Sequence, residues 1–210
     1  MKIELFKQSK GEIMKSRRAF LAAAAAAPLL YPVARHAYTR APAPLPADDG
    51  RHLPNVTLET HDGRQVRFYD DLVKDRLVVI NMMYANCTNL CPPNTANLLQ
   101  VQQALRDHVG KDVFMYSLTL QPAIDKPLDL RRYMDKFDIK PGWTFLTGDP
   151  AHVELLRRRL GFYTLDAAAD ADLKQHTGML RIGNDARDRW SMIPALATPR
   201  QIVNSISNYL

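Results

Sequence analysis

Several features that mark large classes of protein are scarce in this sequence. Its 210 residues include only two cysteines, Cys87 and Cys91, so thiol chemistry can arise at one place only. The apolar stretch Leu21–Leu30 is mostly alanine. It is much shorter than the roughly 20 residues that a membrane-spanning helix requires. We therefore expect no permanent transmembrane anchor.

The net positive charge is also small outside the N-terminus. The chain carries a net charge of +6, but residues 1–37 alone hold seven basic and two acidic side chains. The remaining residues hold 21 basic and 20 acidic side chains, which nearly cancel. Proteins that bind nucleic acid present a strongly basic surface. The sequence therefore predicts no nucleic-acid partner.

Residues 1–37 have the layout of an export signal. A positively charged region leads through Arg17-Arg18 and Phe20-Leu21 into the weakly hydrophobic alanine stretch. This pattern is typical of a twin-arginine (Tat) signal, with an ordinary secretory signal as the alternative. Residues 38–51 then read as a linker rich in proline and alanine. We expect a periplasmic protein whose cysteines meet an oxidising compartment.

Residues 52–210 alternate between strand and helix patterns. Apolar and polar residues alternate around His61-Asp62-Gly63, which predicts an opening β-hairpin. Apart from Arg76 and Asn81, the run 76–83 is apolar, as expected for a central strand buried on both faces. The later patterns predict helix 94–109, strand 112–120, helix 128–137, strand 144–146, helix 151–160, polar loop 165–174, strand 176–182, turn 183–185, strand 190–193 and helix 198–210.

This order of elements predicts one α/β domain with a mixed sheet flanked by helices. We find no internal repeat and no second domain in the sequence. Met82 and Met83 lie in the buried-strand pattern, so we expect them to pack in the core. We expect the same packing role for Trp143 and Trp190. The histidines expected in solvent are His36, His52, His61, His108 and His152.

Cys87 and Cys91 stand between the central strand and the helix that follows it. Residues four apart lie one helical turn from each other, which would direct both sulfurs to one side. The unpaired N–H groups at a helix start also favour a thiolate. Three uses remain open for the pair: binding a soft metal, cycling between dithiol and disulfide, or forming a structural disulfide. A bridge that closes so short a loop stabilises little.

Cys87-x-x-x-Cys91-Pro92 is followed by a set of further matching motifs. They are Ala96-Asn97-Leu98, Ser117-Leu-Thr-Leu, Gly161-Phe-Tyr163 and His176. Together they resemble the Sco/SenC family of thioredoxin-fold copper proteins, which serve cytochrome c oxidase assembly. The resemblance covers residues 52–210. Where the family pattern usually has an acidic residue after the second central strand, this chain has Gln121.

The resemblance implies a thioredoxin-like (peroxiredoxin-like) fold and a copper site formed by Cys87, Cys91 and His176. Thiolates favour Cu(I) and imidazole accommodates both Cu(I) and Cu(II), so this ligand set suits either state. The implied function is a metallochaperone that delivers copper to a partner such as a respiratory oxidase subunit. The sequence does not determine the oligomeric state.

A second hypothesis is a thiol:disulfide oxidoreductase, in which Cys87 and Cys91 reduce the cysteines of a partner metalloprotein before its metal is inserted. Only this hypothesis makes the protein an enzyme. The Cys-x-x-x-Cys spacing is longer than the usual Cys-x-x-Cys of redox enzymes, and thiol exchange does not require His176. Both points favour the metallochaperone. A third possibility is that the cysteines serve another exported metalloenzyme.

Overall fold

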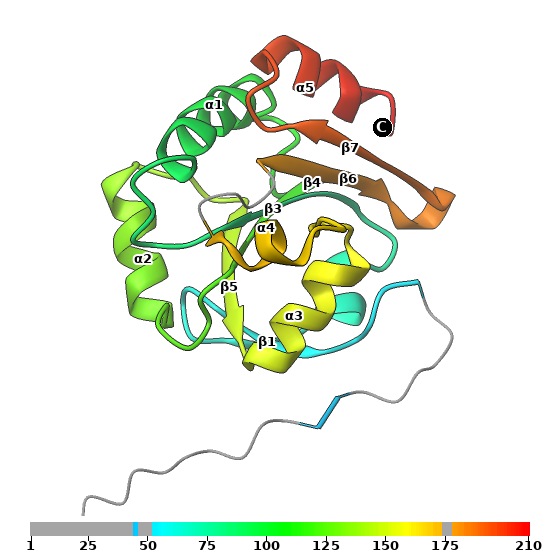
Figure 1. Cartoon of the computed structure of the whole chain (residues 1–210). Helices are drawn as coiled ribbons and strands as arrows, with labels where there is room; N and C mark the ends of the chain where they lie inside the picture. Colours follow the sequence, from blue (N-terminus) through cyan, green and yellow to red (C-terminus); the bar gives the residue numbers. More distant parts are fainter. Residues whose placement is uncertain (1–43, 46–51, 174–177) are drawn as a thin grey trace, which may run out of the picture. The chain divides into compact units, whose positions relative to one another are not determined.

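The computed structural model describes residues 44–45, 52–173 and 178–210. A mixed sheet with the strand order β2-β1-β5-β4-β3-β6-β7 runs through the domain (Figure 1). Its strands are β1 Thr57–Thr60, β2 Gln65–Arg67, β3 Leu77–Met83, β4 Val113–Thr119, β5 Trp143–Gly148, β6 Met179–Asn184 and β7 Arg189–Pro194. The pairs β3–β4 and β4–β5 are parallel, and the other neighbouring strands are antiparallel.

Helices cover both faces of the sheet and enclose two apolar clusters. One cluster lies under α1, α2 and α5, and the other under α3 and the π-helical segment η1. The bounds of the helical segments are η1 Phe68–Val73, α1 Cys91–Ala104, α2 Pro127–Lys136, α3 Pro150–Arg159, α4 Ala167–Ala171, η3 Asp185–Arg187 and α5 Pro199–Ser207. The predicted α/β fold with a mixed sheet is confirmed, and so is its opening hairpin β1–β2.

β3 is the central strand that the apolar run predicts. All of its residues are buried, and successive side chains enter opposite clusters. Val79 and Met83 pack under α1, α2 and α5, whereas Ile80 and Met82 pack against α3 and η1. Burial on both faces leaves no polar alternation in the sequence, as expected for a strand between two helical layers. The predicted core positions of Met82 and Met83 are confirmed.

The predicted turn at residues 183–185 is wrong in its position. Gly183 and Asn184 belong to β6, where Gly183 pairs with Trp190 of β7, and the turn is the segment η3. A Cβ on Gly183 would come within 1.9 Å of the Trp190 ring. The glycine therefore lets the indole ring lie flat across the strand, and this close approach, not a turn, explains its presence.

The helix expected from residue 94 begins earlier, at Cys91, and ends at Ala104. Pro92 and Pro93 occupy its first turn, where a backbone N–H has no helical partner, so proline is tolerated there. The strand expected from His176 begins at Met179. His176 itself lies outside the described residues.

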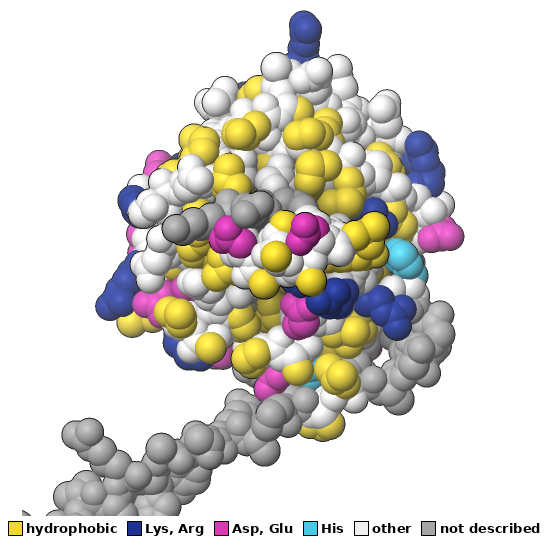
Figure 2. Space-filling view, in the orientation of Figure 1, with side chains coloured by type: hydrophobic (Ala, Val, Ile, Leu, Met, Phe, Trp, Pro, Cys, Tyr) yellow, Lys and Arg dark blue, Asp and Glu magenta, His cyan; other side chains and the backbone are white. Residues whose placement is uncertain are grey.

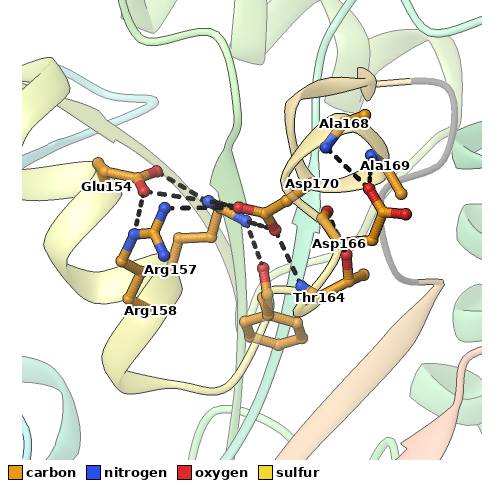
Figure 3. A network of polar contacts seen from close by, with 9 residues as sticks. Glu154, Arg157, Arg158, Thr164, Asp166, Ala168, Ala169 and Asp170 are labelled. Carbon is orange, nitrogen blue, oxygen red and sulfur yellow. Dashed lines mark hydrogen bonds and ion pairs between the residues drawn. The ribbon is translucent and has the colours of Figure 1, made fainter.

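The polar loop expected at residues 165–174 contains the short helix α4, which the sequence pattern did not reveal. Arg157 of α3 donates two hydrogen bonds of 2.7 Å to the carboxylate of Asp170 in α4 (Figure 3). Asp170 also accepts the N–H of Thr164, and Asp166 caps the first N–H groups of the helix. A tertiary ion pair, rather than helical periodicity, therefore fixes α4.

On the face that carries α4, acidic and basic side chains are interspersed among apolar ones (Figure 2). This distribution agrees with the near-neutral charge of the body. Within residues 44–45, 52–173 and 178–210, no helix is both long enough and apolar enough to cross a membrane.

We predict that Asp170→Asn destabilises the fold. The side chains of Arg157 and Asp170 are only 12% and 10% exposed, and loss of a charge-assisted hydrogen bond costs about 1.5 to 3 kcal/mol. Hydrogen bonds from Arg157 hold the pKa of Asp170 well below its usual range. The contribution of the pair is therefore complete above the ordinary aspartate pKa of about 3.9 and is lost as the pH falls below it.

Urea unfolding of the wild type and the variant between neutral and acid pH measures this difference. Asp71→Asn is the control, because it removes the exposed ion pair between Arg67 and Asp71, and exposed pairs contribute little to stability. Equal effects of the two substitutions would contradict a stabilising role for the buried pair.

Candidate metal centre

The loop that carries the two cysteines leaves the sheet at the carboxyl ends of its parallel strands. It runs from Tyr84 to Leu90, between the end of β3 and the start of α1. The N–H of Leu120, just after β4, donates to the carbonyl of Met83 at 2.7 Å. Carboxyl ends of parallel strands are the usual place for binding sites in α/β sheets. We refer to residues 84–91 as the Cys loop.

The turn that leads into α1 brings Sγ of Cys87 to the backbone of Cys91, the first residue of the helix. The backbone N–H of Cys91 donates to Sγ of Cys87 at 3.2 Å. The N–H of Cys87 in turn donates to the carbonyl of Tyr84, also at 3.2 Å. Both cysteines are buried, and no disulfide joins them. The structure therefore presents a reduced thiol pair at a helix start.

The two thiols are not equivalent. Burial raises the pKa of Cys87, but hydrogen bonds from the Cys91 side chain, from the N–H groups of Cys91 and Asn89, and from the Tyr84 hydroxyl outweigh it. The pKa of Cys87 consequently lies below its usual value. Burial raises the pKa of Cys91, and its hydrogen bond to Cys87 raises it further. Cys87 is therefore the thiol that becomes a thiolate first.

Tyr84 is a site residue that the sequence reasoning missed. Its hydrogen bond to Cys87, together with burial, raises the pKa of Tyr84 to about 12. The charge of Asp172 contributes to this rise in the pKa, so Tyr84 also lies near the segment that follows α4. The only hint in the sequence was that Tyr84 stands three residues before Cys87.

Asp125, between β4 and α2, was also missed. Its carboxylate is fully buried and accepts the N–H of Ala85, in the Cys loop, at 3.0 Å. Sequence reasoning turned instead to Gln121, whose backbone N–H donates to the Thr119 hydroxyl at 2.9 Å. Only the fold brings Asp125 beneath the Cys loop, so spacing in the sequence could not identify it.

The third predicted ligand, His176, lies in residues 174–177, outside the described part of the chain. The described residues include no group of three or more histidine, cysteine and acidic side chains that could hold a metal ion. The described residues on either side of this gap are near the site. Leu173 lines a cavity together with Met82 and Leu120, and a Cβ on Gly178 would lie 3.5 Å from Nδ2 of Asn94 in α1.

The prediction that the remaining histidines are solvated is wrong for His152. This side chain is 6% exposed, and its two ring nitrogens lie 3.1 Å from the carbonyls of Thr57 and Pro44. His61 is half-buried and accepts the N–H of Phe145. His52 and His108 are exposed as expected. His36 lies outside the described residues.

Comparison with known families gives one extensive match. A model of the family described as SCO1/SenC matches residues 47–210. The match includes the Cys loop and both layers of helices.

A curated relative, described as an SCO1 protein homolog of Bacillus subtilis, is 29% identical over 93 residues. The match covers 44% of this chain and 47% of the relative, so the chain aligns with about half the length of that protein.

Solved structures confirm the fold. ScoI of Bradyrhizobium japonicum, solved with copper bound, superposes with a TM-score of 0.59 at 22% identity, covering 73% of this chain and 96% of ScoI. BsSco has a TM-score of 0.59 at 21% identity, covering 73% of this chain and 90% of BsSco. It is described as having a disulfide switch and as a member of the Sco family of cytochrome c oxidase assembly proteins. At these identities the likeness establishes a thioredoxin-like Sco fold.

We predict that Tyr84→Phe raises the pKa of Cys87. The substitution removes the hydroxyl that donates to the Cys87 sulfur, and the loss of a donor disfavours the thiolate. At a pH near neutrality the variant should react more slowly with iodoacetamide at Cys87. The rate is measured over a range of pH on the reduced protein, with mass spectrometry to assign the labelled cysteine.

Tyr133→Phe is the matched control. The Tyr133 hydroxyl is buried on the same side of the sheet, but it lies 2.7 Å from the Thr95 hydroxyl rather than donating to Cys87. Its loss should leave the pH profile of Cys87 alkylation in place. A profile that shifts equally in both variants would rule out a specific role for Tyr84.

Proposed function

The chain belongs to the SCO1/SenC family, and on this premise we propose that it is an exported metallochaperone that binds copper through Cys87, Cys91 and His176. It would deliver this copper to the copper centre of a respiratory oxidase. The observation that carries the proposal is the reduced pair of thiols at the start of α1. There, the helical N–H of Cys91 donates to Sγ of Cys87.

The donor set suits copper as a cargo. Thiolates are soft ligands that favour Cu(I), and an imidazole ligand allows Cu(II) as well. The lowered pKa of Cys87 makes its sulfur available as a thiolate near neutral pH. Three protein ligands leave one side of the ion open, and an open side permits transfer to another protein.

The surroundings of the gap at residues 174–177 support His176 as the third ligand. The described residues Leu173 and Gly178 flank it, and Gly178 lies beside Asn94, in the turn of α1 that follows Cys91. The carbonyl of Gly178 accepts the N–H of Ala195, which belongs to the same apolar cluster as both cysteines. Two residues after His176, the chain therefore lies beside the first turn of α1.

Export is part of the proposal. The arginine pair and the alanine stretch in residues 1–37 support transport by the Tat route, and residues 38–51 would link the signal to the domain. A periplasmic location would bring the domain to the side of the membrane where the copper centre of an oxidase subunit can be reached. It would also expose the thiol pair to oxidants.

The unequal thiols also favour a second function, a thiol:disulfide oxidoreductase acting on the cysteines of a partner metalloprotein. Exchange needs one sulfur that attacks as a thiolate and a neighbour that resolves the mixed disulfide. Cys87, with the lowered pKa, fits the first role, and the protonated Cys91 fits the second.

We predict that His176→Ala lowers the affinity for Cu(II) about tenfold or more. Even residues that only support a ligand commonly contribute this much, and a direct ligand should contribute at least as much. Copper titration of the reduced domain without oxygen, followed by the sulfur-to-Cu(II) charge-transfer band, measures the effect. Competition with a Cu(I) chelator gives the affinity for the reduced ion.

His108→Ala is the control for this experiment. His108 is exposed and lies 2.9 Å from Asp112, at the opposite end of α1 from the cysteines. Copper binding by this variant should equal that of the wild type. If His176→Ala also binds copper like the wild type, the three-ligand site is wrong.

For the oxidoreductase, we predict a reduction potential of the Cys87–Cys91 pair above about −300 mV, the range of disulfides that exchange readily. The potential is measured by equilibration with dithiol buffers, and it should be unaffected by His176→Ala. A potential well below this range would mark a disulfide that stays closed, and it would exclude the reductase function.

A further inference from the structure

Asp125 connects the carboxyl ends of three strands beneath the Cys loop. Its Oδ2 accepts the Ala85 N–H at 3.0 Å and the Thr119 hydroxyl at 2.5 Å. Its backbone carbonyl accepts the hydroxyl of Thr147 at 2.8 Å. Ala85 follows β3, Thr119 ends β4 and Thr147 lies in β5. A single residue thus ties the start of the Cys loop to the adjacent parallel strands.

Burial of a carboxyl group at this position is energetically unfavourable. Asp125 is 0% exposed, and within the described part of the chain no lysine or arginine forms an ion pair with it. Its second oxygen, Oδ1, is buried and has no hydrogen-bond partner among the described residues. Burial of a carboxyl group without a cation partner is unfavourable. A position held only by packing would not require such a group.

The surroundings of Asp125 indicate why the Cys loop needs the hydrogen bond from Ala85 to Asp125. A cavity of about 340 Å³ opens beside the Cys loop and is lined by Ala85, Asn86, Ile124, Asp125 and Tyr133, among others. Arg132 and Lys136 also line this cavity, which is open to solvent. Side chains therefore do not cover the start of the loop on this side, and the hydrogen bond to Asp125 holds the Ala85 N–H in place.

We propose that Asp125 is a positioning residue: by holding the N–H of Ala85, it keeps the Cys loop in the conformation that presents both sulfurs to copper. This inference rests on the proposed copper site and extends it. Only Asn86 separates Ala85 from Cys87 in the chain, so a displaced Ala85 would displace Cys87 as well. The donors to Cys87, which come from Asn89 and Cys91, would then be lost.

The test compares Asp125→Ala with Asp125→Asn. The alanine variant loses both hydrogen bonds, and its affinity for copper should fall about 10-fold to 100-fold, as for other residues that support a metal ligand. Its sulfur-to-Cu(II) band should weaken. The asparagine variant retains an oxygen that accepts from both Ala85 and Thr119, so its copper affinity and band should remain close to those of the wild type.

Asp71→Asn is the control, because its carboxylate pairs with Arg67 at the start of η1 rather than with the Cys loop. It should leave copper affinity unchanged. Urea unfolding identifies the fraction of each variant that is folded, and affinities are compared only for folded protein. Copper affinity in Asp125→Ala equal to that of the wild type, or an asparagine variant as weak as the alanine one, would overturn the positioning role.

A second measurement separates this inference from the proposed function. The alkylation rate of Cys87 with iodoacetamide reports on the Cys loop without copper, and it should fall in Asp125→Ala but not in Asp125→Asn. If the wild type binds no copper while these rates differ as expected, the copper function is wrong and the positioning role stands. If the rates are equal in all three proteins, the positioning role is wrong whether or not copper binds.

Discussion

The burial of β3 between two layers of helices is the constraint on which the site depends. A strand that is apolar at every position but Asn81 is stable in the middle of a sheet, where both of its faces are covered. Parallel pairing with β4 then places the ends of both strands at one edge. The Cys loop leaves the sheet at that edge, and α1 begins there because Cys91 and the prolines after it form its first turn. The position of the thiols thus follows from the position of the strand.

Buried polar groups cluster at the same edge of the sheet. Thr119 and Thr147 end neighbouring strands, are almost fully buried, and both donate to Asp125. Backbone N–H and C=O groups at strand ends lack the partners that a ladder provides, so they must be satisfied by turns or side chains. At this edge the solution combines threonine hydroxyls with one carboxylate. These groups form a hydrogen-bonded polar layer beneath the loop that carries the two sulfurs.

Much of the fold could be predicted from the sequence, because β3 and β4 are largely apolar runs and α2 and α5 have amphipathic patterns. The exceptions depend on tertiary contacts. α4 exists through the ion pair between Arg157 and Asp170, and its alanines carry no pattern of their own. His152 stands on a polar-looking helix but is buried because α3 packs on β1, whose Thr57 carbonyl faces the imidazole.

The candidate site shows the same limit. Cys87 and Cys91 were identified from their spacing and their place after the strand, both of which are local in the sequence. Tyr84 is local too, but an aromatic residue at a strand end has several ordinary uses, so its contact with Cys87 could not be predicted. Asp125 is 34 residues beyond Cys91 in the chain, and only parallel pairing brings its loop beside the Cys loop. Interactions between strand ends are therefore the part of a site that sequence patterns reveal least.

The two candidate functions share their first chemical step and separate at the second. Copper binding and disulfide exchange both begin with the thiolate of Cys87, which the donors around its sulfur favour. The next step differs in kind, because a metal ion needs further electron-pair donors, whereas exchange needs only a neighbouring sulfur to resolve the mixed disulfide. Substituting either cysteine would therefore abolish both functions alike. The proposed ligand His176 would contribute to copper binding and not to exchange, so its substitution separates the two functions.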